Sequence, residues 1–440
     1  MLKVVSELQV PAMDLPMPEP GQMARHNFHF PRLFSSAGVW NEHDSRVIGL
    51  LDPVIGGYGG NRKVPSEEAL HIAVNGAFRC GVNLFATYIN TDRYGSKAVG
   101  IFKQLNEYTG RISAMLTGAR IATPVALYYP IEMFQMEYKP TKETHRRNWR
   151  TPRQAAWDNL QTTMLRADVD YNIVHPEWVR DAAIEGGELK IGSGSYRYLV
   201  MPDVEVTSSK VLAKIKQFEA AGGTVLWVDG KPMAGAYPSE DAQVVRAVAG
   251  VAAVSTAQVP RLIPNPYGAK FTLNVTSQNS LLTTRFERQG RSIYFLVNPT
   301  GSSITAHLDD ASGGSVKVYD PVTGKITLMP LPTDVVIDAY KSVLSMPVSK
   351  TSPALSKNNA ADPGGGRSAV VPAEKPKPKK TTATEAPKHR WQDQFFKKRD
   401  RNGDGAITLE EFIGDPKARN VRELTKQFTR ISHLSSRILA

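Results

Sequence analysis

The chain has very little cysteine, with one residue, Cys80, in 440. A single thiol excludes a disulfide framework within the chain and a metal site built from several cysteines. Long apolar runs are missing as well: no stretch approaches the roughly 18 apolar residues of a membrane-spanning helix, so we expect no membrane span. The opening residues, MLKVVSELQVPAMDLPMPEPG, hold no apolar core typical of a signal peptide.

Positive charge, in contrast, is abundant but unevenly placed. The net charge of +12 would suit a nucleic-acid-binding protein. Much of the excess falls in residues 350–390, which hold nine Lys or Arg against three Asp or Glu, and the body before them is nearly neutral. We therefore predict no nucleic-acid partner. Residues 348–390, rich in Pro, Lys and Thr, have too few apolar side chains to offset their conformational entropy, which predicts a disordered linker.

Strands and helices alternate through the middle of the chain. The apolar stretches typical of buried parallel strands are 124–130, 169–176, 196–204 and 224–230. Between them lie amphipathic segments, of which 151–167 and 207–223 are the longest, and Ser208 is a suitable N-cap for the second. This alternation predicts an α/β fold with a doubly wound, flavodoxin-like parallel sheet over residues 123–257.

The same layer lacks the motifs of a catalytic domain. An amidotransferase of similar topology would need a cysteine nucleophile on a strand-to-helix elbow, and Cys80 lies elsewhere. The glycine-rich stretches IGSGS (191–195) and GGYGGNRK (56–63) miss the spacing of a phosphate-binding loop. We interpret both as turns, and the layer as amidotransferase-like but non-catalytic.

From residue 262 the pattern changes to short strands separated by turn residues. LLTTRFERQGRSIYFLVNP contains two strands around a Gly-bearing turn, and SVKVYDPVTGKITLMPL repeats the arrangement. This spacing predicts a small antiparallel β-sandwich over residues 262–347.

The order of these parts resembles that of large bacterial glycoside hydrolases of the α-L-rhamnosidase type. The segments that carry the resemblance are VALYYPIE, DVDYNIV, GSYRYLVMPDV, AAGGTVLWV, IYFLVNPTG and VYDPVTGKI. In those proteins a TIM barrel precedes a flavodoxin-like domain and a β-sandwich. The resemblance implies that residues 26–122 form the last part of such a barrel, after an N-terminal tail over 1–25. It also implies a parent protein that is exported, periplasmic or secreted.

The length of the first segment limits the barrel. About 120 residues precede the first strand of the flavodoxin-like layer, whereas a complete (β/α)₈ barrel needs at least ~200. We therefore expect a partial barrel, in a chain that corresponds to the C-terminal part of a longer glycosidase-like protein.

One carboxylate lies at the end of a predicted strand, where a barrel enzyme would place a catalytic residue. Glycosidases work with two carboxylates, and barrel enzymes carry them at the C-terminal ends of strands. Asp52, in SRVIGLLDPVIGGYGG, is the catalytic candidate, and Tyr58, Asn90 and Asp92 are candidates to contact sugar hydroxyls. The resemblance implies a glutamate before the glycine-rich loop, which is absent here, and a pre-proline turn carboxylate is the alternative role for Asp52. We expect a carbohydrate partner, but no hydrolysis of aryl glycosides.

The stretch DRNGDGAITLEE, residues 400–411, resembles the calcium-binding loop of the EF-hand family. Ca²⁺ takes six to eight oxygen ligands, and the loop offers them at Asp400, Asn402, Asp404, Ala406 (through its carbonyl), Thr408 and Glu411. Gly405 permits the sharp turn around the ion. A solvated turn without an ion is the alternative. We predict a Ca²⁺ cofactor and a helical EF-hand segment over residues 391–440.

Such loops usually come in pairs, but Ser432 stands where a second loop would place its first aspartate, 32 residues after Asp400. Two functions remain open from the sequence. One is a calcium-binding protein whose body is a glycoside-hydrolase-like, carbohydrate-active module. The other is a non-catalytic, calcium-dependent binding or structural protein.

Overall fold

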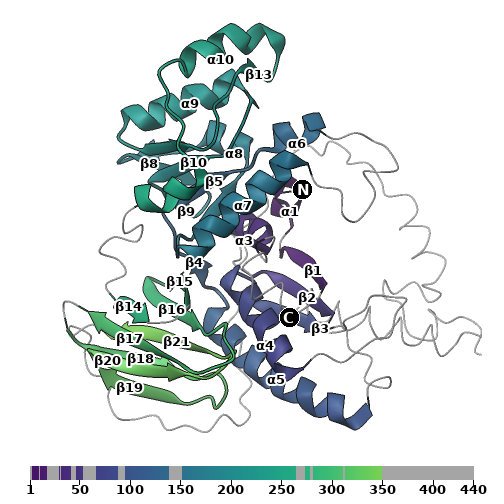
Figure 1. Ribbon diagram of the computed structural model, residues 1–440, viewed down its shortest axis with the longest axis vertical. Helices are drawn as coiled ribbons and strands as arrows, with labels where there is room; N and C mark the ends of the chain where they lie inside the picture. The colour runs from purple at the N-terminus through teal and green to yellow at the C-terminus, as the bar shows by residue number, and fades with distance from the viewer. Residues whose placement is uncertain are drawn as a thin grey trace, which may run out of the picture. The chain divides into compact units, whose positions relative to one another are not determined.

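The computed structural model divides the chain into two units, Met1–Leu355 and Ser356–Ala440. The residues it describes all lie in the first unit: 2–8, 10–16, 29, 31–40, 46–52, 66–87, 95–137, 151–263, 273–277, 281–310 and 313–348. They form three packed parts: a part with a short parallel sheet, named the barrel-like part after the fold expected from its sequence, an α/β part and a β-sandwich (Figure 1).

The barrel-like part is a parallel sheet of three strands in the order β1-β2-β3. The strands are β1 (Ala12–Pro16), β2 (Ile48–Asp52) and β3 (Leu84–Thr87). The helices of this part are α4 (Glu67–Arg79) and α5 (Gly95–Leu116), while α1 (Leu2–Ser6) and α3 (Pro31–Trp40) bury Leu2, Val5 and Ala37 in the core of the α/β part. Each strand is thus followed by a helix, as in a β/α barrel. Strand β1 falls within residues 1–25, where the sequence predicted only a tail, and Pro16 at its end suits an edge strand.

The α/β part contains the parallel sheet that the sequence predicted. Its strands are β5 (Val125–Tyr128), β6 (Asn172–Val174), β10 (Tyr198–Met201) and β12 (Thr224–Trp227). Their spatial order is β12-β10-β5-β6, so the first strand of the part lies between the second and the third, which is the doubly wound order of flavodoxin. A parallel bridge from Val228 to Val254 continues the sheet beyond β12.

Helices and small elements surround this sheet. The helices are α6 (Ile131–Glu137), α7 (Pro152–Arg166), α8 (Pro176–Asp181), α9 (Ser209–Ala220) and α10 (Asp241–Ala247), with 3₁₀ turns at Pro238–Glu240 and Thr256–Leu262. The small strands are β7 (Ala183–Glu185), β8 (Glu188–Ile191), β9 (Gly194–Tyr196), β11 (Val206–Thr207) and β13 (Ala234–Gly235). IGSGS forms the tight turn between β8 and β9, where Gly192 has φ of 54°.

The local sequence explains why α9 forms. Ser208 caps it by accepting a hydrogen bond from the Lys210 amide at 3.2 Å. Its four inward apolar residues, Val211, Leu212, Ile215 and Phe218, are all at most 2% exposed. Full burial of such side chains stabilises the folded state by about 1.5–3 kcal/mol each, so the predicted amphipathic face does anchor this helix to the sheet.

The β-sandwich consists of two antiparallel sheets, as the strand spacing predicted. One sheet joins β14 (Leu273–Ser277), β17 (Ile304–Asp310) and β20 (Thr333–Ile337). The other has the order β19-β18-β21-β16-β15-β4. Its strands are β4 (Arg120–Ile121), β15 (Leu282–Arg288), β16 (Arg291–Val297), β18 (Ser315–Tyr319), β19 (Ile326–Pro330) and β21 (Ser342–Val348). Side chains of both sheets meet in one apolar core.

The sandwich is joined to the barrel-like part by a second core. Phe78 of α4 and Ile112 of α5 are buried in the same cluster as Phe286, Phe295 and Leu344 of the sandwich. Phe78 and Phe295 meet edge to face, with ring centroids 6.0 Å apart. The helices of the barrel-like part therefore cover one face of the six-stranded sheet. No helix among the described residues is long and apolar enough to cross a membrane.

Candidate functional site

The parallel strands of the barrel-like part end at a common edge. In the register of the sheet, Asp52 pairs with Pro16, and Leu51 pairs with Thr87. Parallel strands with this register bring their C-terminal ends together, which is where barrel enzymes build their sites. Of the three described strand ends, only that of β2 carries a carboxylate, Asp52.

The structure describes this candidate site only in part. It places the backbone of Asp52 at the end of β2, but not the side chain. Tyr58 follows β2, and Asn90 and Asp92 follow β3, in segments outside the described residues. The strand ends are thus brought together, while the contacts of the four side chains remain predictions.

The predicted calcium loop lies outside the described residues altogether. Its ligands, Asp400, Asn402, Asp404, Ala406, Thr408 and Glu411, all belong to the second unit. Within the described part of the chain, no group of three or more His, Cys, Asp or Glu side chains is placed to hold a metal ion. The Ca²⁺ assignment therefore still depends on the sequence motif.

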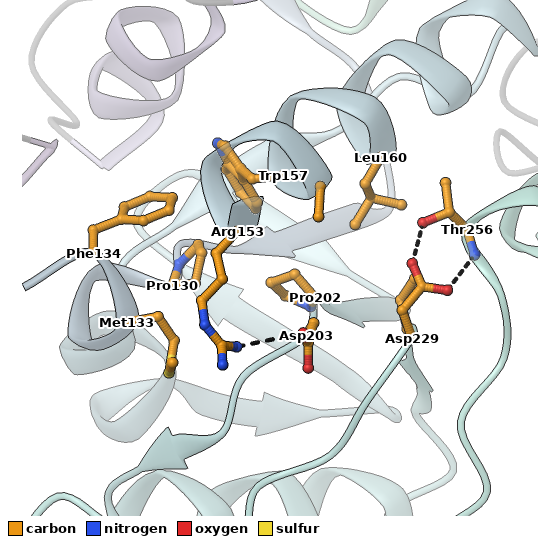
Figure 2. A pocket seen from close by; sticks show the side chains of 12 residues that line it. Pro130, Met133, Phe134, Arg153, Trp157, Leu160, Pro202, Asp203, Asp229 and Thr256 are labelled. Carbon is orange, nitrogen blue, oxygen red and sulfur yellow. Dashed lines mark hydrogen bonds and ion pairs between the residues drawn. The ribbon is translucent and has the colours of Figure 1, made fainter. Parts of the chain in front are cut away.

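A second cluster of polar side chains lies in the α/β part, where β5, β10 and β12 end (Figure 2). Its centre is Arg153, in the first turn of α7. The guanidinium of Arg153 forms ion pairs with three carboxylates: Nε is 2.9 Å from Glu137, Nη1 is 3.4 Å from Asp203, and Nη2 contacts Glu205. Three carboxylates share one cation, so the cluster is negative overall.

This cluster forms one side of a pocket with apolar walls. Arg153, Asp203 and Asp229 are the charged residues that line it, and Thr256 adds a hydroxyl. The apolar lining residues are Pro130, Met133, Phe134, Ala156, Trp157, Leu160, Pro202 and Val228. Figure 2 shows Arg153 reaching from α7 toward Asp203, with Trp157 and Phe134 beside it. The rings of Phe134 and Trp157 meet edge to face at 6.4 Å.

The two aspartates of the pocket differ in their surroundings. Asp229 accepts hydrogen bonds from the amide of Thr256 at 3.0 Å and from its hydroxyl at 2.5 Å, and it adopts a left-handed backbone with φ of 58°. Asp203 has the long contact with Arg153 and a side chain that is 38% exposed. Burial raises the pKa of Asp203, the charge of Arg153 opposes the rise, and Glu205 adds to it. Asp203 is therefore the carboxylate with acceptor capacity to spare.

The residues of this pocket match no catalytic motif in the sequence, from which the layer is predicted to be non-catalytic. A signal was present, however, because a proline or an aspartate comes within two residues after each of three strands: Pro130 after β5, Pro202 and Asp203 after β10, and Asp229 after β12. In open α/β sheets, ligands bind outside the carboxyl ends of the strands, so these residues mark the edge to inspect.

The chain resembles known proteins in its fold, but it matches no protein family. No protein-family model and no curated protein matches the chain. Among solved structures, a rhamnosidase from Novosphingobium sp. PP1Y matches at 14% identity and a TM-score of 0.54, over 82% of this chain and 37% of its own. A β-galactosidase from Bacillus circulans sp. alkalophilus matches at 13% identity and a TM-score of 0.54, over 79% and 61%.

A third match is Gan42B, a GH42 β-galactosidase from G. stearothermophilus, at 12% identity and a TM-score of 0.52, over 78% of this chain and 60% of that one. This chain thus spans between 37% and 61% of the length of these three proteins. The expected glycoside-hydrolase-like fold is confirmed. At these identities the likeness concerns the fold alone.

Proposed function

We propose that the body of this protein is a glycoside-hydrolase-like, carbohydrate-active module that binds sugar at the C-terminal edge of strands β1 to β3. The observation that supports this most is the position of Asp52, which ends β2 at the edge where the three parallel strands terminate together. The fold shared with a rhamnosidase and two β-galactosidases supports a carbohydrate as the ligand. Tyr58, Asn90 and Asp92 would contact sugar hydroxyls from the neighbouring segments.

Binding, rather than turnover, is the activity we propose for this edge. A glycosidase needs two carboxylates on either side of the scissile bond, roughly 5–9.5 Å apart. Asp52 is the one carboxylate at the described strand ends. A lone general acid supplies only about 10²–10⁴-fold of rate, far below what glycosidases achieve. Aryl α-L-rhamnoside and aryl β-D-galactoside should therefore not be hydrolysed above the buffer rate.

Saturation-transfer NMR on the full chain tests this proposal, with methyl α-L-rhamnopyranoside and methyl β-D-galactopyranoside as probes. We expect signals from at least one sugar and a loss of roughly tenfold in affinity in Asp52→Asn, because a hydrogen bond to a charged group contributes about 1.5–3 kcal/mol. Asp181→Asn, at an exposed ion pair with Arg180, is the matched control. Equal affinity of wild type and Asp52→Asn would remove Asp52 from the site.

The sequence motif supports a second function beside this one, calcium binding by residues 400–411. The six oxygen ligands predicted there match the spacing of an EF-hand loop. The alternative to a carbohydrate-active module, a non-catalytic protein that binds a partner in a calcium-dependent manner, depends on the same loop. The two are separated by sugar binding measured with and without Ca²⁺, since the module should bind sugar without the ion. By its resemblance, the parent protein is proposed to act outside the cytoplasm.

A further inference from the structure

We propose that strand β19 of the sandwich is an interaction edge, at which two copies of this protein pair as antiparallel strands into a two-fold dimer. This surface shares no residue with the proposed sugar-binding edge of β1 to β3. Strand β19 is the outer strand of the six-stranded sheet, and in the described part of the chain β18 is its one strand neighbour (Figure 1). The other side of its backbone can therefore take a further strand.

The hydrogen bonds at the two ends of β19 show which of its backbone groups face outward. The amide of Asp320 donates to Lys325 at 3.0 Å, and the amide of Leu331 donates to Gly314 at 3.0 Å. Both bonds follow the register between β18 and β19. Opposite residues of antiparallel strands alternate between bonded and non-bonded pairs. Every second residue of β19 thus bonds to β18, and the others turn their backbone polar groups to the open side: Ile326, Leu328 and Pro330.

The outward-turned residues also carry exposed apolar side chains. Ile326 is 57% and Leu328 61% exposed, whereas Met329, on the opposite face, packs against the sandwich core. Edge strands are commonly protected from pairing by charged side chains, and β19 has none. The opposite edge of the same sheet does carry charge, because Arg120 of β4 forms an ion pair with Glu287 at 3.6 Å. Strand β19 is therefore the edge of this sheet that suits pairing.

The length of this edge matches a second copy of itself. The amides available for pairing are those of Ile326 and Leu328. Pro330 has no amide hydrogen, and the amide of Gly324 is used within the turn before the strand, at 2.8 Å. In a two-fold pairing centred at Thr327 or at Leu328, two amides from each of two copies reach a carbonyl, which makes four hydrogen bonds. A longer foreign strand would leave the carbonyl opposite Pro330 without a donor.

The distribution of charge also permits self-pairing. Residues 326–333 hold no Lys, Arg, Asp or Glu, so the strand places no like charges opposite each other when it meets its copy. In the two registers, the Lys325 side chains of the two copies are four or six residues apart along the pair, at least about 13 Å. Lys317 of β18, opposite Leu328, is three strand spacings from its copy, about 14 Å. Both distances exceed the screening length of about 8 Å at physiological salt.

The size of the contact sets its strength. A stable interface takes about 20–30 residues from each partner, and β19 supplies five. The dimer should therefore be reversible and should form as the protein concentration rises. A permanent dimer would need a larger surface than this edge.

Sedimentation velocity of the full chain tests the proposal, at concentrations from about 5 μM to about 500 μM, the range in which a small interface associates. Wild type should shift from monomer toward dimer. Leu328→Lys should weaken association by about tenfold or more, because it brings two ammonium groups to the centre of the pairing. Leu328→Pro should weaken it as well, because it removes an outward amide and leaves the bonds to β18 in place.

Val336→Lys is the matched control, at a side chain 63% exposed on β20 of the other sheet, and should associate like wild type. Wild type that stays monomeric at the highest concentration would overturn the proposal. A dimer that persists unchanged in Leu328→Lys would overturn it too, because that dimer must use another surface. Equal weakening by Val336→Lys would show an effect of net charge and not of β19.

Introduced cysteines give a measurement that does not depend on affinity. The native thiol, Cys80, is buried, so a thiol on β19 is the accessible one. Residues that face each other across an antiparallel pair have Cα atoms about 4.5–5.5 Å apart, within the range of a disulfide. Under mild oxidation, Thr327→Cys should cross-link in one register and Leu328→Cys in the other. If neither forms more covalent dimer than Val336→Cys, the pairing is rejected.

Discussion

Arg32 in α3 and Asp170 before β6 form an ion pair in which the guanidinium is 0% and the carboxylate 2% exposed. Arg32 also donates to the carbonyl oxygens of Tyr171 at 3.2 Å and Arg79 at 3.0 Å. The second oxygen of Asp170 accepts from the amide of Arg285 in β15 at 3.4 Å. One buried pair therefore connects all three parts of the body.

We predict that Arg32→Met destabilises the body by about 3–5 kcal/mol, because it leaves the Asp170 carboxylate buried without its cation. Urea unfolding followed by tryptophan fluorescence measures the change. Lys216→Met, at a surface pair with Glu219, is the control and should stay within about 0.5 kcal/mol of wild type. A similarly small effect of Arg32→Met would show that the pair does not hold the parts together.

Tyr108→Phe should cost about 1–3 kcal/mol, since it strips partners from buried polar groups. The hydroxyl of Tyr108, in α5, donates to Asn75 at 2.9 Å and lies 2.6 Å from the hydroxyl of Ser342 in the sandwich. Burial raises the pKa of Tyr108, so the group stays a neutral donor. The melting temperature measures the loss, with Tyr237→Phe, at a side chain 67% exposed, as the unaffected comparison.

The free energy of unfolding should decrease as the pH falls, and His71 accounts for part of this decrease. Burial lowers the pKa of His71, and the ammonium of Lys341, 3.0 Å from Nε2, lowers it further, while Glu67 and Glu68 oppose the shift. The usual pKa of histidine is about 6.5. Below that pH, the unfolded chain binds a proton at His71 that the native state does not bind. The His71 contribution is therefore present above pH 6.5 and lost as the pH falls toward the lowered pKa.

His71→Gln removes this titration while keeping an amide near Lys341. The free energy of unfolding in urea, measured at pH 7.5 and pH 5.5, should drop less in the variant than in wild type. Equal drops in the two proteins would show that His71 is not coupled to folding over this range.

For the calcium loop we predict that Glu411→Gln removes most of the binding heat in isothermal titration of the full chain with CaCl₂. A bidentate carboxylate at the last position of the loop supplies two of the oxygens. Glu410→Gln, at the preceding position, is the matched control and should titrate like wild type. An unpaired loop should bind at about 10⁻⁴–10⁻³ M, the range of extracellular modules. Identical heats for the two variants would contradict the assignment of ligands.

Elements with local determinants could be predicted from the sequence. Helix α9 is an example, because Ser208, the apolar face and Gly222 with φ of 92° at its end all lie within one short segment. Strand β1 was not predicted, because AMDLP is short, follows Pro11 and ends in Pro16, and it is a strand through its pairing with β2. Its stability comes from tertiary contacts, which composition does not show.

Some residues of the candidate sites could likewise be predicted from the sequence, and others could not. Asp52 could be placed at a strand end from the apolar run before it. The residues that follow β5, β10 and β12 could be located in the same way, but the ion pairs of Arg153 could not, since their carboxylates come from residues 137, 203 and 205 and meet only when β5 and β10 become neighbours. The pair of Arg32 and Asp170, 138 positions apart in the chain, has no signal in the sequence at all.

Strand β4 affects where recombination could divide this chain without breaking a strand pairing. Arg120 and Ile121 belong by chain order to the passage between the barrel-like and α/β parts, yet they pair with Glu287 and Phe286 at the edge of the sandwich. A recombination event at the apparent boundary near residue 122 would carry the last strand of one sheet away with a different gene segment. An exchange that keeps this pairing must therefore carry residues 120–121 together with the sandwich.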